Sequence, residues 1–389
     1  MTPMSTTRTT LLALSLIFVS SCSMNGYHHS VELTSLHNPE QALNRLSYQT
    51  SNYHPLTQQD AEKDAVALQT LQDNYSDQVI EQWGRESAQF SSRTRYVKYS
   101  NDYRSRSIID FQQGSVQVDT LAQQHSKQFL KQAIEYTLLA PDTPEYTNFY
   151  TAYSSEVKGT PFLYQQVRDQ DGKLIKWHWR AAHYANYLIK HNLSQTPSAN
   201  KQVSSVTFSL VPNHTQIRMQ RYQPLIQKFA ERHGIDENLV KAIIQTESLF
   251  NPYALNATGR VGLMQISANS IGQDVFRQQK KYPFSPTQRF MFSPHNNLDL
   301  GVGYLNLLNQ HYLSAIKDPN SRHYAILASY IAGPNNMLQT FSKDKTEALA
   351  MINRLSSYEV YQSLTSKLTR PEIKNYVYKV NSNYRKFSE

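Results

Sequence analysis

The chain has 389 residues, enough for two domains of ordinary size. Only 39% of the residues are hydrophobic, which excludes a protein built from many membrane-spanning helices and predicts substantial loop or linker. The formal net charge is +9, and all of the excess lies in residues 210–389, with 21 Lys and Arg against 12 Asp and Glu. A basic half of this kind favours an anionic partner, which leaves nucleic acid, anionic lipid and anionic cell wall open.

The first residues have the pattern of an export signal. Thr10 to Val19 form an apolar run behind a segment whose only charge is Arg8; this run is too short to span a bilayer comfortably but suits a secretory signal. It leads into small residues and Cys22, the only cysteine of the chain. This arrangement resembles the bacterial lipobox, so we expect a signal peptide over 1–21 and a lipid on Cys22. The alternative is an ordinary signal peptide with an unrelated cysteine.

The export signal also limits which anionic partners the basic half can meet. Ser23 follows the lipidated position, where an aspartate would resemble a signal for retention at the inner membrane. The resemblance therefore implies attachment to the outer membrane, on its periplasmic face. An exported protein rarely meets nucleic acid, so we expect cell wall or lipid as the anionic partner and no nucleic acid. Residues 22–68 are rich in Ser, Asn, His and Gln without a sustained hydrophobic period, which predicts a flexible tether.

An α+β accessory domain is predicted for residues 69–212. A four-residue apolar period from Leu71 to Trp83 indicates a helix that Gly84 ends. Strands are expected at 105–111, 115–121, 162–167, 174–179 and 203–210, with helices at 121–138 and 180–192. No catalytic signature occurs in this part of the sequence. Trp177 and Trp179 could stack on sugars, but alternating aromatic residues of a strand are more often core.

Residues 213–389 are predicted to be almost entirely helical. Apolar periods place helices at 218–233, 236–250, 298–308, 324–330 and 373–384. The whole chain is thus predicted to be α+β, with an N-terminal mixed α/β domain followed by a mainly α-helical domain. It contains no phosphate-binding loop, no metal-ligand spacing and no nucleophilic serine motif, so we expect neither a metal nor a cofactor.

A single carboxylate interrupts the apolar face of one of these helices. Val240, Ile243, Ile244 and Glu247 share that face, and Asp236 is expected to cap the first turn. Glu247 then lies in the last turn, where burial and the negative end of the helix dipole both favour its protonated form. A neutral carboxylic acid is what a glycosidic oxygen needs in order to leave as an alcohol. The alternative is that Glu247 reaches the rim of the face and forms a salt bridge.

The sequence around this helix carries a family resemblance. Glu247 to Ala254 (ESLFNPYA) resembles the E-S-x-F-N-P-x-A signature of the soluble lytic transglycosylase domain, and Gly262 to Ile266 (GLMQI) resembles its G-L-M-Q motif. Two later motifs of the family are similar to Ser329–Gly333 (SYIAG) and, less closely, Lys374–Val377 (KNYV). Three upstream segments resemble the N-terminal domain of the membrane-bound lytic murein transglycosylase C family: Tyr96–Tyr99, Gly159–Tyr164 and Val211–His214.

The resemblance implies that residues 213–389 form a lysozyme-like catalytic domain. Such domains cleave the β-1,4 bond between N-acetylmuramic acid and N-acetylglucosamine in peptidoglycan. Glu247 would act first as an acid on the leaving oxygen and then as a base on the muramoyl 6-hydroxyl, which closes a 1,6-anhydro ring. No acidic residue lies between Ser248 and Gln273, and an internal nucleophile removes the need for a second carboxylate.

The same resemblance assigns five further residues to the substrate cleft. They are Ser248, Met264, Gln265, Tyr330 and Tyr376. Ser248 and Gln265 would form hydrogen bonds with the sugar or its N-acetyl group, and Met264 would form apolar wall. The Tyr376 hydroxyl would approach Glu247 and orient it. For each of the five, packing in the core is the alternative.

One departure from the family bears on function. The asparagine that follows the family's tyrosine is Ile331 here, so an amide that can donate and accept is replaced by an aliphatic side chain. Asn335 and Asn336 are near enough in sequence to supply the missing hydrogen bonds. Three functions therefore stay open: a lipid-anchored lytic transglycosylase, a hydrolytic muramidase of the same fold, and a non-catalytic wall-binding lipoprotein.

Overall fold

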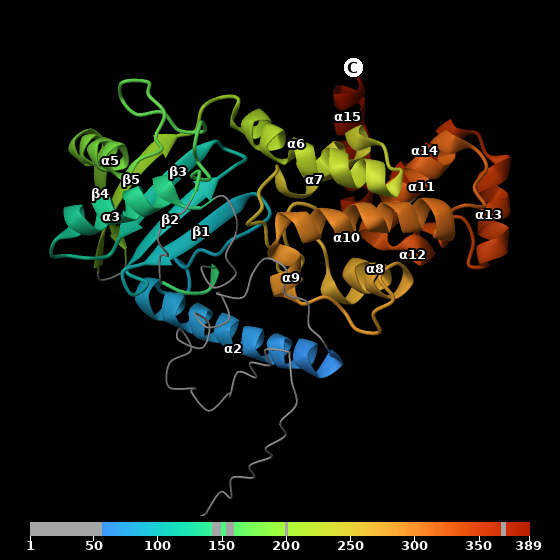
Figure 1. The fold of residues 1–389 in the computed structure, drawn as a ribbon, viewed down its shortest axis with the longest axis horizontal. Coiled ribbons are helices and arrows are strands. Elements are labelled where there is room, and N and C mark those ends of the chain that lie inside the picture. Colours follow the sequence, from blue (N-terminus) through green and yellow to red (C-terminus); the bar gives the residue numbers. More distant parts are fainter. Residues whose placement is uncertain (1–56, 142–148, 153–158, 199–200, 367–370) are drawn as a thin grey trace, which may run out of the picture.

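A computed structural model describes residues 57–141, 149–152, 159–198, 201–366 and 371–389. The predicted signal peptide, Cys22 and the tether up to residue 56 lie outside these ranges. A sheet with its helices lies toward one end of the long axis, and a helical part lies toward the other (Figure 1). The α+β class, with a mixed N-terminal part followed by a helical part, is confirmed.

The N-terminal part is built on one antiparallel sheet. Its elements are α2 (Gln58–Trp83), β1 (Arg95–Ser100), β2 (Ser105–Asp110), β3 (Ser115–Thr120), α3 (Ser126–Leu139), α5 (His178–Asn192), β4 (Leu193–Ser198) and β5 (Lys201–Ser209). The strand order is β1-β2-β3-β5-β4. Helices α3 and α5 pack against each other and cover β2, β3 and β5. Helix α2 runs along the lower side of the molecule, beneath the sheet and toward α8 (Gln273–Gln278) and α9 (Gln288–Phe292) of the helical part (Figure 1).

The C-terminal part contains only helices among its described regular elements. These are α6 (His214–His233), α7 (Glu237–Ser248), η2 (Ala268–Gly272), α8 (Gln273–Gln278), α9 (Gln288–Phe292), α10 (Pro294–Leu307), η3 (Leu308–Tyr312), α11 (Pro319–Ala332), α12 (Pro334–Leu338), α13 (Lys345–Arg354), α14 (Ser357–Ser366) and α15 (Pro371–Ser388). Helix α7 packs mainly against α15 and α6, and α11 packs against α15 and α14. This arrangement buries α7 on several sides, which is why the environment of its side chains is dry.

Several sequence predictions are confirmed. The predicted hairpin is formed by β2 and β3, in which Ser105 pairs with Thr120 and Asp110 with Ser115. Gly84 and Gly234 adopt positive φ after α2 and α6, as expected of residues that end helices. The five predicted helices of the C-terminal part correspond to α6, α7, α10, α11 and α15.

Two predictions about the regular elements of the N-terminal part are wrong. Helix α2 begins at Gln58 rather than near residue 69, so the predicted tether ends earlier. The first turns of α2 are largely polar and exposed, so this part of the helix shows no apolar period in the sequence. Residues 162–167 and 174–179 are not strands. Turns close through Leu163 and Asp169, only the bridge between Arg168 and Leu174 pairs the two segments, and α5 already begins at His178.

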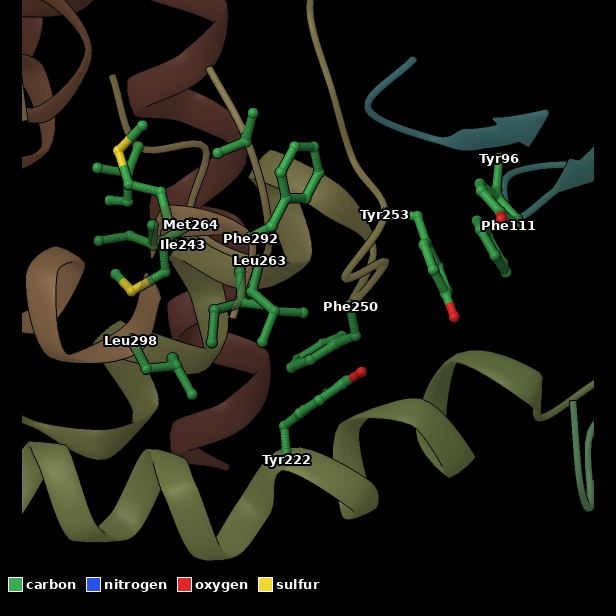
Figure 2. Packing of buried hydrophobic residues seen from close by; sticks show 14 of the residues in the cluster. Tyr96, Phe111, Tyr222, Ile243, Phe250, Tyr253, Leu263, Met264, Phe292 and Leu298 are labelled. Atoms are coloured by element: carbon green, nitrogen blue, oxygen red, sulfur yellow. The ribbon is translucent and has the colours of Figure 1, made fainter. Parts of the chain in front are cut away.

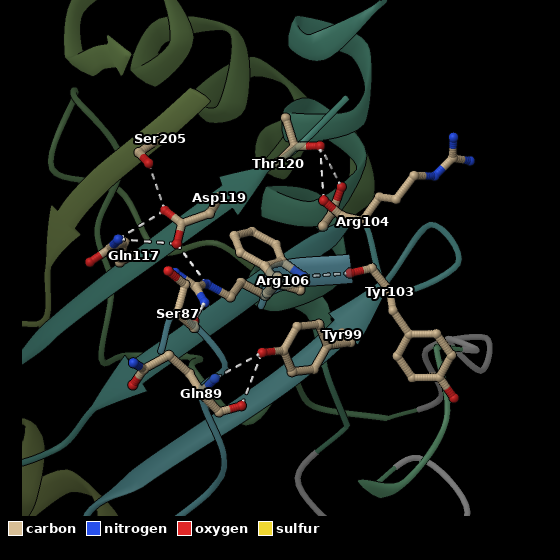
Figure 3. Close-up of polar contacts among 12 residues, drawn as sticks. Ser87, Gln89, Tyr99, Tyr103, Arg104, Arg106, Gln117, Asp119, Thr120 and Ser205 are labelled. Atoms are coloured by element: carbon tan, nitrogen blue, oxygen red, sulfur yellow. Dashed lines mark hydrogen bonds and ion pairs between the residues drawn. The ribbon is translucent and has the colours of Figure 1, made fainter. Parts of the chain in front are cut away.

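A buried ion pair fastens the sheet to its surroundings. Arg106 of β2 donates to Asp119 of β3 at 2.8 Å and to the Ser87 carbonyl at 2.6 Å, and its guanidinium lies 3.9 Å from the Trp83 ring centroid (Figure 3). Ser205 of β5 also donates to Asp119, at 2.7 Å. These buried polar groups satisfy one another's hydrogen-bonding capacity, so we assign the network a structural role rather than a catalytic one.

Candidate active site

Glu247 lies in the last turn of α7, where the sequence places it. Asp236 caps the helix by accepting from the Asn238 amide, as predicted, and Leu249 ends it in the left-handed conformation. The Glu247 side chain is only 2% exposed. Burial is the largest influence on its carboxyl and raises its pKa above the ordinary value of 4.5. The alternative of a glutamate at an exposed rim is therefore wrong, although Glu247 does form an ion pair.

Two arginines and a tyrosine oppose the effect of burial. In decreasing order of size, the charges of Arg260 and Arg93 and a hydrogen bond from the Tyr376 hydroxyl lower the Glu247 pKa. The hydrogen bond is not fully formed: Glu247 Oε1 and the Tyr376 hydroxyl are both buried and neither has a partner within normal hydrogen-bond geometry. We therefore treat Tyr376 as a close neighbour of the carboxyl that is poised to bond to it. The carboxyl can thus hold a proton, yet its ionised form has two cations nearby.

Arg93 comes from the N-terminal part of the chain. Its Nη1 lies 3.6 Å from Glu247 Oε2, and its side chain is 44% exposed. The backbone carbonyl of Arg93 accepts a hydrogen bond from the Asn251 side chain at 3.2 Å, and the Ser92 carbonyl accepts from the Leu255 amide at 3.4 Å. The loop before β1 therefore rests on the segment that follows the Glu247 helix.

That segment turns sharply. Leu249 and Phe250 both have positive φ, at 53° and 58°, which is uncommon for residues other than glycine and is found at functional sites. Asn251 closes the turn by accepting from the Tyr253 amide at 3.0 Å. Tyr253 stacks on Tyr96 of β1 with ring centroids 4.1 Å apart (Figure 2), and its hydroxyl donates to the Pro141 carbonyl.

A buried arginine holds the same turn from its other side. Arg218 of α6 is fully buried, and it donates to the Leu249 carbonyl at 3.1 Å and to Gln166 Oε1 at 2.7 Å. A third bond, of 2.9 Å, joins it to Nδ1 of His214, whose pKa is lowered to about 4 by burial and by the Arg218 charge. His214 is therefore neutral near pH 7 and can accept this bond. Arg218 thus ties the C-terminal end of the Glu247 helix to the N-terminal part.

The predicted G-L-M-Q motif forms a tight turn beside Glu247's neighbour Ser248. The Ser248 hydroxyl is fully buried and donates to the Leu263 carbonyl at 2.7 Å, which fastens the helix to the turn. Gly262 has φ of 76°, and a Cβ there would lie 2.4 Å from Asn297 Nδ2, so only glycine fits. Asn297 in turn accepts from the Met264 amide at 2.8 Å and donates to the Val261 carbonyl at 2.8 Å.

The two side chains that follow in this turn have different surroundings. Met264 is fully buried among other core side chains (Figure 2), and it lies against Gly301 of α10. Its predicted contact with sugar stays a prediction that this placement does not favour. Gln265 has φ of 50°; its Nε2 donates to the Gly262 carbonyl at 3.1 Å, and its Oε1 is buried without a partner. An unpaired amide oxygen on a strained residue is the kind of acceptor that a ligand donor would satisfy.

Tyr330 and Tyr376 complete the surroundings of Glu247. Their rings are stacked with an interplanar angle of 4° and centroids 6.5 Å apart. The hydroxyl of Tyr330, a residue of α11, donates to the Met264 carbonyl at 2.8 Å and so holds the turn of residues 262–266 in place. Burial raises both tyrosine pKa values well above 10, and the charge of Glu247 adds to this, so both stay neutral. The structure therefore brings Glu247 and Tyr376 together, with Tyr330 stacked behind them.

Ile331, which replaces the family's asparagine, is partly buried against the core. Asn335 and Asn336 are both exposed, and the Asn336 amide donates to the Ala332 carbonyl of its own turn at 2.8 Å. Neither asparagine contacts Glu247 among the interactions that the described residues make. Their role as a replacement stays a prediction.

Two cavities border the loop that carries Arg260. The larger, of about 590 Å³, lies between α2 and the region of residues 258–291, and the smaller, of about 320 Å³, lies between α2, Phe149–Tyr150 and residues 255–259. Glu247 lines neither of them. Both share Gly259, next to Arg260, so they extend alongside the site rather than contain it. The chemistry of Glu247, not cavity size, identifies the site.

Sequence reasoning missed four side chains of this site. Arg93 and Arg260 act on Glu247, and Arg218 and Asn297 hold the two turns beside it. Asn297 and Arg218 interrupt the apolar faces of their helices, as Glu247 does, and this signal could have found them. Nothing in the sequence near Arg93 joins it to a residue so distant along the chain. Among the residues that the structure describes, no group of three His, Cys, Asp or Glu is arranged to hold a metal ion.

Two family models match consecutive parts of the chain. Residues 61–221 match the family model of the membrane-bound lytic murein transglycosylase C N-terminal domain, and residues 224–353 match that of the transglycosylase SLT domain. The protein named membrane-bound lytic murein transglycosylase C from Serratia proteamaculans (strain 568) is 38% identical over 321 residues, which cover 82% of this chain and 89% of that protein. The chain belongs to the membrane-bound lytic murein transglycosylase C family.

A second relative agrees with this assignment, and one solved structure shows a partial likeness. The protein of the same name from Yersinia pestis (strain Pestoides F) is 38% identical over 329 residues, covering 84% of this chain and 92% of that protein. The crystal structure of the 70 kDa soluble lytic transglycosylase from Escherichia coli matches 45% of this chain and 26% of that chain, with 22% identity and a TM-score of 0.34. In this member of the transglycosylase C family, both matched regions meet at Glu247: Arg93 lies in the first and Glu247 in the second.

Proposed function

We propose that the protein is a murein lytic transglycosylase. It cleaves the β-1,4 bond between N-acetylmuramic acid and N-acetylglucosamine and forms 1,6-anhydromuramic acid, in turnover of the cell wall. Family membership supports the substrate and the reaction. The observation that carries the mechanism is one buried carboxyl, Glu247, whose pKa is raised by burial. Among the described residues, the groups that act on it are two arginines and a tyrosine, not a second carboxylate.

The first step needs Glu247 as an acid. Its proton passes to the glycosidic oxygen as the bond from that oxygen to the muramoyl anomeric carbon breaks, so the N-acetylglucosamine residue leaves as an alcohol. Glu247 is then an anion in a dry site. Arg93 and Arg260 limit the cost of that anion, and the Tyr376 hydroxyl can complete its hydrogen bond to the ionised carboxyl.

The second step uses the same carboxylate as a base. Glu247 takes the proton of the muramoyl 6-hydroxyl, whose oxygen bonds to the anomeric carbon and closes the 1,6-anhydro ring. The carboxyl regains its proton, so the enzyme is returned to its starting state and no water is consumed. A glycosidase that activates water or forms a covalent intermediate needs a second carboxylate about 5 to 9.5 Å away. The surroundings of Glu247 favour the internal nucleophile.

Other residues have supporting roles in this proposal. Tyr376 orients Glu247, and Gln265 offers its unpaired Oε1 to a sugar hydroxyl or N-acetyl amide. Ser248 and Tyr330 hold the turn that presents Gln265, through their bonds to the Leu263 and Met264 carbonyls. Direct contacts of Ser248, Met264 and Tyr330 with sugar remain part of the proposal.

We further propose that the protein is attached to the outer membrane by a lipid on Cys22 and faces the periplasm. The relatives are named membrane-bound, and the lipobox-like segment before Cys22 supports a lipid anchor. In the described part of the chain no helix has the length and apolar character to cross a membrane. Residues 1–21 would be the signal peptide and the residues from Cys22 up to the start of α2 at Gln58 the linking region. The accessory domain would run from α2 to residue 212 and the catalytic domain would cover 213–389.

Product analysis on intact sacculi tests the reaction. Muropeptides released by the unmodified protein should carry anhydro ends, which are one water lighter than reducing ends in a mass spectrum. Reducing ends alone would assign the protein to the hydrolytic muramidases. Glu247→Gln should release nothing while still binding sacculi. If the unmodified protein also released nothing, the non-catalytic wall-binding function, for which Ile331 is the hint, would replace this proposal.

A further inference from the structure

Trp177 and Trp179 are not core residues, contrary to the prediction from their alternation. They lie at the start of α5, where Trp177 is the N-cap, and they are 60% and 61% exposed. Tyr187, farther along α5, and Tyr136 of the adjacent α3 are exposed as well. Exposed apolar side chains that gather in one region often mark an interaction site. We call the outer surface of these two helices, with its four exposed aromatic residues, the α3–α5 face.

The charge of the α3–α5 face is positive. Helix α5 contains no Asp or Glu, and its excess positive charge comes from Lys190 and from Lys176 just before it, because Arg180 is paired with the buried Asp169. The Lys176 ammonium lies 5.2 Å from the Trp177 ring centroid, and the Arg180 guanidinium lies 4.4 Å from that of Trp179. Each exposed indole is therefore accompanied by a cation.

Two of the carboxylates near this face are already paired. Asp169 binds Arg180 at 2.5 Å and is buried. Glu135 of α3 binds His178 at 3.2 Å and Lys131 at 3.9 Å, and its side chain is 13% exposed. Neither of these two acids is presented to solvent. Asp171 is exposed; it accepts from Gln170, whose Nε2 lies 3.0 Å from Nδ1 of His183 in α5. Lys176 and Lys190 still outnumber this one exposed acid.

We propose that the α3–α5 face binds the surface of a membrane that contains anionic phospholipid. Trp and Tyr rings are favoured at the depth of lipid headgroups because one end is apolar and the other polar. Lys176 and Lys190 would meet the headgroup phosphates, to which Lys and Arg near a membrane surface are attracted. This binding is independent of the cleavage reaction and would add a second contact to a lipid anchor.

The geometry favours lipid over a glycan strand. A sugar stacks on the flat face of an aromatic ring, and one face of each indole here is already covered by a cation. A lipid surface needs only the exposed ring edge. The orientation also fits: α5 lies at one end of the long axis, and α13 and α14 of the catalytic part lie at the other (Figure 1). A membrane bound to the α3–α5 face would leave the catalytic part projecting away from it.

The tryptophans themselves provide the readout. The chain has 3 Trp, and the third, Trp83, is buried. The full-length protein is reconstituted into vesicles of phosphatidylethanolamine and phosphatidylglycerol in which the acyl chains of the phosphatidylethanolamine are brominated near the headgroup. Because two of the three tryptophans lie on the α3–α5 face, bromine should remove up to about two thirds of the emission. Vesicles made with neutral phosphatidylcholine in place of phosphatidylglycerol should give much weaker quenching, and high salt should reverse it.

Matched variants test the role of charge. Lys176→Glu combined with Lys190→Glu should abolish the quenching in anionic vesicles, whereas Lys345→Glu, an exposed lysine of α13, should not. All three substitutions should leave the release of muropeptides from sacculi unchanged, so this proposal and the proposed reaction can fail separately. Equal quenching in neutral and anionic vesicles, or none in either, would overturn the proposal. A spectral shift produced by soluble glycan strands or by raised protein concentration without vesicles would also overturn it, in favour of wall binding or self-association.

Discussion

The contact between Arg93 and Glu247 yields the most specific prediction. At 3.6 Å and an effective dielectric constant near 20, a charge pair is worth roughly 5 kcal/mol. Arg93 is 44% exposed, and solvent screening reduces such pairs to about 1 kcal/mol. Arg93→Gln removes a charge that favours the ionised carboxyl, so Glu247 should keep its proton to higher pH. The alkaline limb of the pH–activity profile should move upward.

The assay is release of muropeptides from sacculi, measured as kcat/KM across pH. Because Arg93 also limits the cost of the Glu247 anion, each profile is compared after normalisation to its own maximum. On the alkaline side, the Arg93→Gln variant should then retain up to about fivefold more of its maximal activity than the unmodified protein does, the factor that corresponds to about 1 kcal/mol. Arg93→Lys should restore most of the original profile. Arg95→Gln is the matched control, because Arg95 is 46% exposed and forms a similar pair with Asp110 at 3.5 Å. An unchanged limb in Arg93→Gln, or an equal shift in Arg95→Gln, would refute the assignment of Arg93.

Three further predictions concern stability. Burial raises the pKa of Glu247 in the folded state above its ordinary 4.5, so the folded state loses stability as pH rises from about 4.5 through the raised value. Glu247→Gln should therefore increase Tm at pH 7 in a thermal melt. This gain should vanish below pH 4.5, where the carboxyl is protonated in both the folded and the unfolded state. Arg218→Met removes the donor to the Leu249 carbonyl and should lower the free energy of unfolding, measured in urea, by about 2 to 4 kcal/mol. The kcat of the protein that stays folded should also fall. Unaltered stability would contradict the role of Arg218 as a link between the two parts of the chain. Gly262→Ala places a Cβ 2.4 Å from Asn297 and should lower Tm and activity together, and full activity at unchanged Tm would show that the turn is not needed.

The sequence predicted the centre of the site because local pattern determines it. Glu247 interrupts a face made by Val240, Ile243 and Ile244, and a helix with a 3.6-residue period turns that face inward. Asp236 and Leu249 begin and end the helix within two residues of expectation. Burial of a carboxylate at a known place on such a helix is enough to predict its raised pKa.

What sequence could not supply depends on contacts between distant segments. Arg93 lies in a loop without a regular period, and it approaches Glu247 only because the loop before β1 docks on Asn251 and Leu255. The same limit explains the false strands at 162–167 and 174–179. Their apolar residues are buried by turns, which alternation alone does not distinguish from a pleated strand.

The orientation of Trp177 and Trp179 is a related case. Alternation in a short apolar segment suggested a strand with a buried face, but the segment ends as α5 begins, and the helix turns both indoles outward. The error is informative, since it leaves two large rings exposed beside cations and thereby suggests the membrane contact.

Digestion of sacculi by the unmodified protein in water enriched in ¹⁸O tests the central claim most directly. If the muramoyl 6-hydroxyl is the nucleophile and Glu247 serves as both acid and base, the released muropeptides carry anhydro ends and no heavy oxygen at the anomeric carbon. Hydrolysis would place one ¹⁸O at each new reducing end. Heavy oxygen in the initial products would contradict the single-glutamate mechanism, and its absence with anhydro ends is the result we predict.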